Sequence, residues 1–381
     1  MRKRCSSKQW QETDCLETLQ TKLYCCKGQI ISLILKNGCN PIQGRLTKVK
    51  DGVIILDHSR VISICDVVSF NPIFIAYVVN SGDDEVLGDD SVSVISTETN
   101  MEIAGRIPVG NGPIGIAITP DGKLAYVTNA ADNTVSVIST MTNTEVQPRI
   151  PVGNIPFGIA ITPDGCRVYV VNLGDSTVSV ISTVSNTEIH PPIPVGGGPV
   201  SIAITPNGRR AYVTNSFDDT VSVIRIPENK EILPRIPVGD TPIDIAITPN
   251  GKRAYVTNGF ENTVSVIDTA TNEEILPRIP VGEGPRGIEI TPDGSRAYVT
   301  LLNENSVSII NIATNSEILP RIQVGEAPIR VAITPDGLRA YVTNIGSNNV
   351  SVINTVTNTE ILPRIPVGLL PLGIAITPNC V

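Results

Sequence analysis

The chain has 381 residues, a net charge of −8 at pH 7 and 17% charged residues. The acidity is unevenly spread, because residues 1–70 carry 11 Lys and Arg against 6 Asp and Glu, whereas the remainder carries 18 against 31. Surfaces that bind nucleic acids need clustered Lys and Arg, so the composition argues against a nucleic-acid partner for the acidic body. The chain has no apolar run of 18 residues, and we therefore expect no membrane span.

The first 20 residues are predicted to form an N-terminal arm. Met1 to Arg4 is basic, but polar residues 6–13 follow where a secretory signal would need an apolar stretch. We therefore expect no signal peptide, and a cytoplasmic location by default.

Cysteines are concentrated near the start of the chain. Six of the eight lie within the first 65 residues, and the other two are Cys166 and Cys380. A large repeat domain has enough core to fold without disulfide bonds, and no paired C-x-x-C motifs are present. We therefore expect mostly free thiols. The alternative is a set of surface thiols that cross-link to partners.

Residues 21–71 are predicted to fold as a small β-barrel. Five short strands are expected, at residues 29–36, 43–50, 53–56, 61–64 and 65–70. Asn37-Gly38 and Asp51-Gly52 are typical of tight hairpins. The arrangement resembles the Sm-like and SH3-like small barrels, which implies ring oligomers and RNA binding. A net charge of only +5 over residues 1–70 and the lack of an aromatic stacking run argue against RNA, so oligomerisation or anchoring is the expected use.

The rest of the chain is a repeat. A Tyr-Val strand recurs seven times, and a Val-Ser-(Val/Ile)-Ile strand follows it each time. The tyrosines are Tyr77, Tyr126, Tyr169, Tyr212, Tyr255, Tyr298 and Tyr341. The first step is 49 residues and the other five are 43. A fixed period of this length indicates stacked copies of one supersecondary structure.

One copy of the repeat predicts four antiparallel strands. Residues 158–162 and 168–172 form two strands around a Pro-Asp-Gly turn, and residues 177–182 form a third. The fourth segment, residues 188–196, contains prolines that lack an N–H donor, so it is expected at the outer edge of the sheet. A small Ala in the first strand of six copies suits the crowded innermost position. These features predict an all-β fold of four-stranded propeller blades.

The Tyr-Val-Thr-Asn strand, the Thr-Pro-Asp-Gly turn and the Val-Ser-Val-Ile strand together resemble the YVTN-type β-propeller repeat family, familiar from surface-layer-like proteins. The resemblance covers about residues 73–381. It implies a seven-bladed propeller over residues 72–381 with a binding or surface-scaffold role, and a cell-surface location. The repeat begins on a second strand and ends on a lone first strand, so residues 372–378 are expected to close the ring.

Positions where the copies differ are the candidate sites. The start of each innermost strand should face the mouth of the central channel, and successive copies place Asp244, Arg286 and Arg330 there. Glu289 replaces the Ala that the other six copies have in this strand. We predict that these four residues bind a polar ligand or peptide, with the arginines holding a carboxylate or phosphate. The alternative is a local cluster in which Glu289 pairs with Arg286 or Arg330.

Two further acidic patterns recur outside the channel. The long turn of the first blade contains Asp83, Asp84, Asp89 and Asp90, which are hard oxygen ligands suited to calcium, although a solvated acidic loop is the alternative. Most copies also place a Glu four residues before an Arg in the outer strand. An extended strand separates such residues by about 13 Å, so no direct ion pair is expected.

No catalytic set can be assembled from the sequence. The two histidines, His58 and His190, fall in different predicted domains, and no Ser-His-Asp set, zinc cluster or phosphate-binding loop is present. We therefore predict a non-catalytic binding or assembly scaffold without a cofactor, whose propeller face binds a protein partner or a small polar ligand. Two alternatives stay open: a lactonase-type hydrolase at the channel mouth, and a structural cell-surface or coat component.

Overall fold

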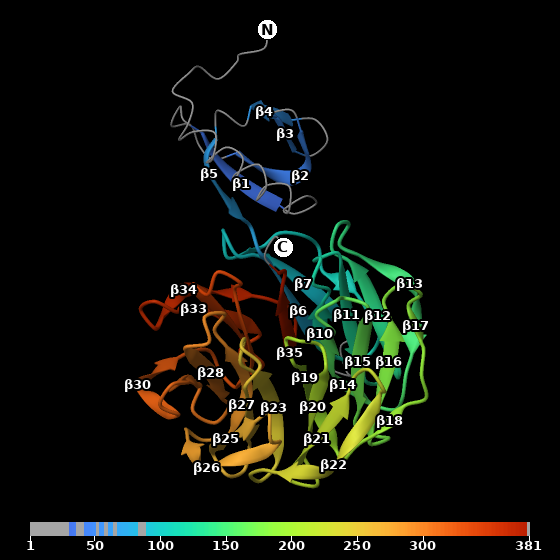
Figure 1. The fold of residues 1–381 in the computed structure, drawn as a ribbon. Helices are drawn as coiled ribbons and strands as arrows, with labels where there is room; N and C mark the ends of the chain where they lie inside the picture. The colour runs from blue at the N-terminus through green and yellow to red at the C-terminus, as the bar shows by residue number, and fades with distance from the viewer. Residues whose placement is uncertain are drawn as a thin grey trace, which may run out of the picture. The chain divides into compact units, whose positions relative to one another are not determined.

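A computed structural model describes residues 30–35, 42–50, 53–56, 60–63, 67–82 and 89–378 (Figure 1). The chain divides into two compact units: residues up to Ile75 with Ser96–Thr99 and Thr377–Val381, and Ala76–Ile95 with Asn100–Ile376. The predicted arm at residues 1–20 and the cysteines other than Cys166 lie outside the described residues. Within the described ranges, no helix has the length and hydropathy that a membrane crossing needs.

The first unit contains an antiparallel sheet of five strands, in the order β4-β3-β2-β1-β5. The strands are β1 (Ile30–Leu35), β2 (Ile42–Lys50), β3 (Val53–Leu56), β4 (Arg60–Ser63) and β5 (Val67–Pro72). They lie close to the positions expected from the hairpin motifs. Ile31, Leu33, Leu46, Ile54 and Leu56 are fully buried. The described residues show no pairing between β4 and β5, so closure into a barrel stays a prediction.

The second unit is a seven-bladed β-propeller, which confirms the predicted architecture (Figure 1). Each blade is an antiparallel sheet whose strands follow one another from the innermost outward. Blade 1 contains β35 (Pro371–Ile376), β6 (Ile75–Ser81), β7 (Asp90–Ser96), β8 (Met101–Glu102) and β9 (Ile107–Pro108). Blade 2 contains β10 (Pro113–Ile118), β11 (Leu124–Asn129), β12 (Thr134–Ser139) and β13 (Thr144–Pro151). Blade 3 contains β14 (Pro156–Ile161), β15 (Arg167–Asn172), β16 (Thr177–Ser182), β17 (Thr187–Glu188) and β18 (Ile193–Pro194).

The remaining four blades each have four strands. Blade 4 contains β19 (Pro199–Ile204), β20 (Arg210–Asn215), β21 (Thr220–Arg225) and β22 (Lys230–Pro237). Blade 5 contains β23 (Pro242–Ile247), β24 (Arg253–Asn258), β25 (Thr263–Asp268) and β26 (Glu273–Pro280). Blade 6 contains β27 (Pro285–Ile290), β28 (Arg296–Leu301), β29 (Ser306–Asn311) and β30 (Ser316–Gln323). Blade 7 contains β31 (Pro328–Ile333), β32 (Arg339–Asn344), β33 (Asn349–Asn354) and β34 (Thr359–Pro366).

The C-terminal strand supplies the innermost strand of blade 1. β35 pairs antiparallel with β6, which places Ala375 opposite Tyr77 and Pro371 opposite Asn80. The blade is therefore assembled from both ends of the repeat region, which is the arrangement that the phase of the repeat predicts.

The repeated tyrosine ties each blade to the next. Its ring is buried, and its hydroxyl donates to the side-chain oxygen of an asparagine on a turn of the following blade. The pairs are Tyr77–Asn143 (2.8 Å), Tyr126–Asn186 (2.7 Å), Tyr169–Asn229 (2.5 Å), Tyr212–Asn272 (2.8 Å), Tyr255–Asn315 (2.7 Å), Tyr298–Asn358 (2.8 Å) and Tyr341–Asn100 (2.7 Å). These asparagines have a positive φ, a backbone region in which Asn is enriched. Each buried hydroxyl is thus satisfied by a neighbouring blade.

The outer strands show that one expectation was wrong. Glu and Arg four residues apart do form direct ion pairs, for example Arg149–Glu145 at 2.8 Å and Arg278–Glu274 at 2.8 Å. The reason is a bulge in the outer strand. In blade 2, Val146 and Ile150 of β13 face residues of β12 that are only two positions apart, so the bulge shortens the distance between Glu145 and Arg149. The expectation of about 13 Å holds only for a regular extended strand.

The acidic residues that recur in the turn after the second strand also have structural partners. In blade 5, Glu261 accepts a hydrogen bond from the backbone N–H of Asp240 at 3.2 Å and pairs with Arg278 at 2.9 Å.

In blade 3, His190-Pro191-Pro192 interrupts the outer edge, which is split into β17 and β18. Consecutive prolines cannot donate to a ladder, and this blade has no arginine at the equivalent position.

Candidate functional site at the mouth of the channel

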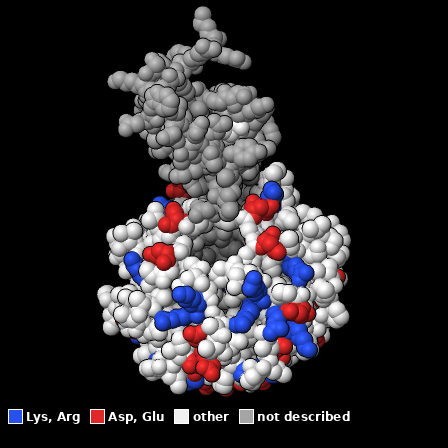
Figure 2. Space-filling model, viewed as in Figure 1, with Lys and Arg blue, Asp and Glu red and all other residues white. Residues whose placement is uncertain are grey.

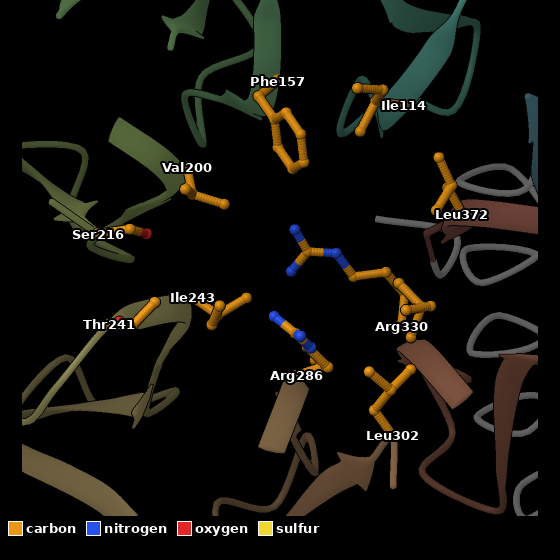
Figure 3. A pocket seen from close by; sticks show the side chains of 12 residues that line it. Ile114, Phe157, Val200, Ser216, Thr241, Ile243, Arg286, Leu302, Arg330 and Leu372 are labelled. Atoms are coloured by element: carbon orange, nitrogen blue, oxygen red, sulfur yellow. The ribbon is translucent and has the colours of Figure 1, made fainter. Parts of the chain in front are cut away.

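The mouth of the central channel is a ring of seven side chains, one from each innermost strand. The ring consists of Ile114, Phe157, Val200, Ile243, Arg286, Ile329 and Leu372. Together with Ser216, Thr241, Leu302 and Arg330, the ring lines a cavity of about 340 Å³ (Figure 3). Six members of the ring are apolar and one is cationic. We call this space the mouth cavity.

The next residue of each innermost strand forms a second ring: Gly115, Gly158, Ser201, Asp244, Gly287, Arg330 and Gly373. Asp244 and Arg330 lie two blades apart, with Gly287 between them. A Cβ at Gly287 would come within 2.9 Å of the Cα of Arg330, so only glycine permits this close approach. Arg330 reaches past blade 6, and its Nη1 pairs with Oδ2 of Asp244.

Asp244 is buried and its carboxylate is well supplied with donors. The Ser201 hydroxyl donates to Oδ1 at 2.6 Å, and the backbone N–H of Ile288 donates to Oδ2 at 3.0 Å, in addition to the pair with Arg330. These three contacts hold both oxygens of the carboxylate in place. Asp244 therefore orients Arg330 and is poorly placed to act as a free base.

Arg286 differs from Arg330 because its Nε is buried and has no hydrogen-bond partner among the described residues. Burial, with a smaller contribution from the nearby charge of Arg330, lowers the pKa of the Arg286 guanidinium. Both guanidinium groups point into the mouth cavity and lie close to each other (Figure 3). Two cations held together with only one paired carboxylate create a site that favours an anion.

The backbone of Arg286 is held by the preceding blade. The Thr257 hydroxyl donates to the carbonyl oxygen of Arg286 at 2.7 Å and accepts a hydrogen bond from the N–H of Asp244 at 3.0 Å. One threonine thus fixes the start of two adjacent innermost strands. The same contact recurs elsewhere, for example from Thr300 to the carbonyl oxygen of Ile329 at 2.9 Å.

Glu289 lies further along the channel and lines a second cavity of about 180 Å³, together with Asp244 and Arg330. Burial, and then the negative charge of Asp244, raise the pKa of Glu289 to about 8. The carboxyl is therefore mostly protonated at neutral pH. Arg330 lines both cavities and so connects the mouth cavity to this carboxyl.

The structure brings Asp244, Arg286, Glu289 and Arg330 to one side of the channel. The ion pair, however, joins Arg330 to Asp244, whereas the alternative interpretation of the sequence pairs Glu289 with an arginine. Among the described residues, no ion pair involves Glu289. The sequence reasoning missed Ser201 and Thr257 as supporting residues. Thr257 could not be found by comparing the copies, because the other blades have Thr or Val at its position.

The calcium candidates in the long turn of blade 1 are the other site predicted from the sequence. Asp83 and Asp84 lie outside the described residues, whereas Asp89 pairs with Arg106 at 2.9 Å and accepts a hydrogen bond from the N–H of Leu369 at 2.7 Å. The described residues contain no cluster of three or more acidic, His or Cys side chains that could hold a metal ion. Figure 2 shows acidic and basic side chains interspersed on the propeller surface in view.

Comparison with known proteins identifies the class of fold. The family model described as "Lactonase, 7-bladed beta-propeller" matches residues 156–324. That segment is less than half of the chain. No curated protein matches the sequence. The comparisons thus confirm a β-propeller, part of which matches the lactonase model, without showing the YVTN-type family or an Sm-like barrel.

Several solved structures share the fold. A protein of Desulfotomaculum acetoxidans DSM 771, described as functionally unknown, has a TM-score of 0.69 at 21% identity and covers 80% of this chain and 99% of its own. A protein of Bacteroides uniformis ATCC 8492, titled a "putative 6-phosphogluconolactonase", has a TM-score of 0.68 at 19% identity, with 80% and 99% coverage. Kuenenia stuttgartiensis hydrazine synthase has a TM-score of 0.64 at 24% identity and covers 73% and 94%. At these identities the likeness establishes the fold alone.

Proposed function

We propose that the propeller is a lactonase-type hydrolase that binds a small anionic lactone at the channel mouth. The observation that carries the proposal is the convergence of Arg286 and Arg330 on one cavity, with the Glu289 carboxyl in the adjoining cavity. The match to the lactonase model and the neighbour titled a "putative 6-phosphogluconolactonase" support this class over the non-catalytic scaffold.

The anionic group of the substrate binds to Arg286. This guanidinium has a buried Nε that no described residue satisfies, whereas Arg330 is already paired with Asp244. While Glu289 is protonated, the four charged positions carry a net charge of +1. A bound anion would therefore neutralise the site and supply the missing hydrogen-bond acceptor.

Hydrolysis adds water to the lactone carbonyl carbon and breaks the ring C–O bond, which leaves a hydroxy acid. In the proposed reaction, the Glu289 carboxylate takes a proton from the attacking water and returns it to the ring oxygen as that bond breaks. A pKa of about 8 suits a group that must both accept and donate a proton near neutral pH. Arg330, which lines both cavities, stabilises the negative charge that develops on the carbonyl oxygen.

The test is a pH-indicator assay, because opening a lactone releases one proton per turnover near neutral pH. The substrates are 6-phosphogluconolactone, a γ-lactone that carries a carboxylate, and the methyl ester of that γ-lactone. We expect turnover of an anionic lactone, a loss of about 10- to 100-fold in kcat/KM for Arg286→Leu, and a loss of about 100-fold in kcat for Glu289→Gln. The exposed Arg209 provides a matched control, and Arg209→Leu should behave like the wild type.

The wild-type rate on the preferred lactone should rise with pH, reach half of its maximum near pH 8 and level off above that pH, as the Glu289 carboxylate forms. Turnover that survives both Arg286→Leu and Glu289→Gln would place the reaction elsewhere. Absence of turnover on every anionic lactone would favour the interpretation of the propeller as a non-catalytic scaffold.

We also propose an Sm-like first unit and a YVTN-type repeat. The strand order β4-β3-β2-β1-β5 supports an Sm-like first unit that could form oligomers. The recurring Tyr-Val-Thr-Asn strands support a YVTN-type repeat with a surface-layer-like role. Neither conflicts with a lactonase site, because the site depends on the few positions that depart from the repeat.

A further inference from the structure

The chemistry of the mouth cavity is unusual for a site that would bind a sugar. Six of the seven ring positions are apolar: Ile114, Phe157, Val200, Ile243, Ile329 and Leu372. Each copy of the repeat could carry a polar residue here, as Arg286 shows, without disturbing the strand that follows. Figure 3 shows Phe157 and Ile114 facing the two guanidinium groups across the cavity.

The apolar ring is not simply part of the hydrophobic core. Val200 is only 9% exposed, but the other five apolar members retain partial exposure on a concave wall. Concave apolar surfaces with a few convergent polar groups are typical of small-ligand sites. A volume of about 340 Å³ lies near the lower end of the range for such sites, which favours a compact ligand.

Hydroxyl-rich ligands would find few partners in this cavity. Apart from the arginines, the polar side chains that line it are Ser216 and Thr241. The Ser216 hydroxyl already donates to the carbonyl oxygen of Pro242 at 2.6 Å, and the Thr241 hydroxyl donates to Asp240 at 3.0 Å. A polyol would therefore lose its hydrogen bonds to water and replace only some of them, which lowers affinity.

The charge of the site also discriminates between anions. Arg286 and Arg330 together with Asp244 give a net charge of +1 while Glu289 is protonated. A monoanion such as a carboxylate matches this charge, whereas a phosphate monoester near its second ionisation brings close to two negative charges into a half-buried site. The second charge would face Asp244, which already raises the pKa of Glu289.

We propose that the mouth cavity is a subsite for a compact monocarboxylate with an apolar, alkyl or aromatic body. The carboxylate binds Arg286 beside Arg330, and the body packs on Phe157, Ile114 and Leu372. The role of this subsite in a reaction rests on the proposed lactonase function. If that function holds, the inference identifies the substrate as a carboxylated lactone with an apolar substituent. The binding itself does not require any turnover.

The test is calorimetric titration of the full chain with three probes that cannot be hydrolysed as lactones: phenylacetate, phenylacetamide and 6-phosphogluconate. Phenylacetamide has the same body as phenylacetate without the charge. We expect phenylacetate to bind most tightly, with a Kd at least about tenfold below those of the other two. Arg286→Leu should abolish the preference for phenylacetate over phenylacetamide.

Variants of the ring separate the apolar contribution from the charge. Phe157→Ser, and independently Leu372→Ser, should weaken phenylacetate binding by about tenfold, because each removes apolar area that the ligand covers. Phe260→Ser is the matched control, because Phe260 is 73% exposed and does not line the cavity. Melting curves of all three variants report whether the ring is intact.

Each result decides the proposal. Tighter binding of 6-phosphogluconate, equal binding of phenylacetate and phenylacetamide, an unchanged Kd in both ring variants, or no binding at all would overturn it. The outcome is independent of the hydrolase proposal. Phenylacetate binding without lactone turnover would support the subsite and contradict the hydrolase proposal. Turnover of phosphorylated lactone without phenylacetate binding would support the hydrolase proposal and contradict the subsite.

Discussion

The two sides of the channel have the same backbone and different chemistry. On one side, β35, β10 and β14 carry glycine at the second ring position and alanine two residues later. On the other side, β23, β27 and β31 carry Asp244, Arg286, Glu289 and Arg330 among the equivalent positions. The strands keep the same length and the same pairing with their neighbours. The repeat therefore provides a scaffold that tolerates charge on one side, and the charged side is where specific chemistry is possible.

The largest effect is expected when Asp244, the carboxylate that pairs with Arg330, is removed. Asp244→Ala would leave the guanidinium groups of Arg330 and Arg286 together without a compensating carboxylate, and would leave Ser201 without its acceptor. Because breaking a buried ion pair leaves an uncompensated charge, we expect a loss of about 3–5 kcal/mol in the free energy of unfolding. Urea denaturation measures this loss.

An exposed ion pair outside the channel provides the comparison for the loss of stability expected at Asp244. Asp218 is 40% exposed, pairs with Arg235 at 3.5 Å and accepts a hydrogen bond from the N–H of Gly197 at 2.6 Å, so Asp218→Ala should cost only about 1–2 kcal/mol. Equal losses in Asp244→Ala and Asp218→Ala would show that the charged side of the channel has no special energetic role.

Much of this comparison could be predicted from the sequence. The spacing of the tyrosines predicts seven blades, and the comparison of copies singles out all four charged residues of the channel. The pairing among them could not be predicted, because it depends on side-chain reach. Arg330 passes Gly287 to contact Asp244, and nothing in the spacing favours that contact over one with Glu289.

Other misses have the same physical origin. The direct Glu145–Arg149 pair depends on a bulge that shortens the outer strand, and a regular strand was the natural assumption. The apolar ring at the mouth was visible as a column of aligned residues. Its importance follows only from the cavity that those side chains enclose.

An intermediate effect is expected from the pH dependence of Glu289. Its pKa is raised to about 8 in the folded protein, from an ordinary value of 4.5. Between these values the folded state holds a proton that the unfolded state has released, so stability falls as pH rises from about 4.5 to about 8. At about 1.4 kcal/mol per unit of pKa, the full shift corresponds to at most about 5 kcal/mol. Because Glu289 lines a cavity and is only partly buried, we expect wild type to lose less than this limit, roughly 2–4 kcal/mol relative to Glu289→Gln.

The measurement is a series of urea titrations of wild type and Glu289→Gln between pH 5 and pH 9. The difference between the two proteins should change steadily with pH from about pH 5 and should level off above about pH 8. Asp244 and Arg330, which line the same cavity, are common to both proteins and cancel in the difference. Parallel pH profiles would mean that Glu289 titrates like an exposed carboxylate.

The smallest effect should be the same on both sides of the channel. Tyr126 in the apolar half and Tyr255 in the charged half each donate a hydrogen bond to an asparagine of the next blade, both at 2.7 Å. Replacing either by Phe keeps the buried ring and removes the hydrogen bond to the asparagine, and at Tyr255 also a long contact of 3.5 Å with the carbonyl oxygen of Ile312. Each variant should therefore lose about 1 kcal/mol in the free energy of unfolding. Equal losses would show that the ties between blades are uniform and that the asymmetry is confined to the innermost strands. A loss in Tyr255→Phe several times that in Tyr126→Phe would instead mean that the charged residues strain the blades that carry them.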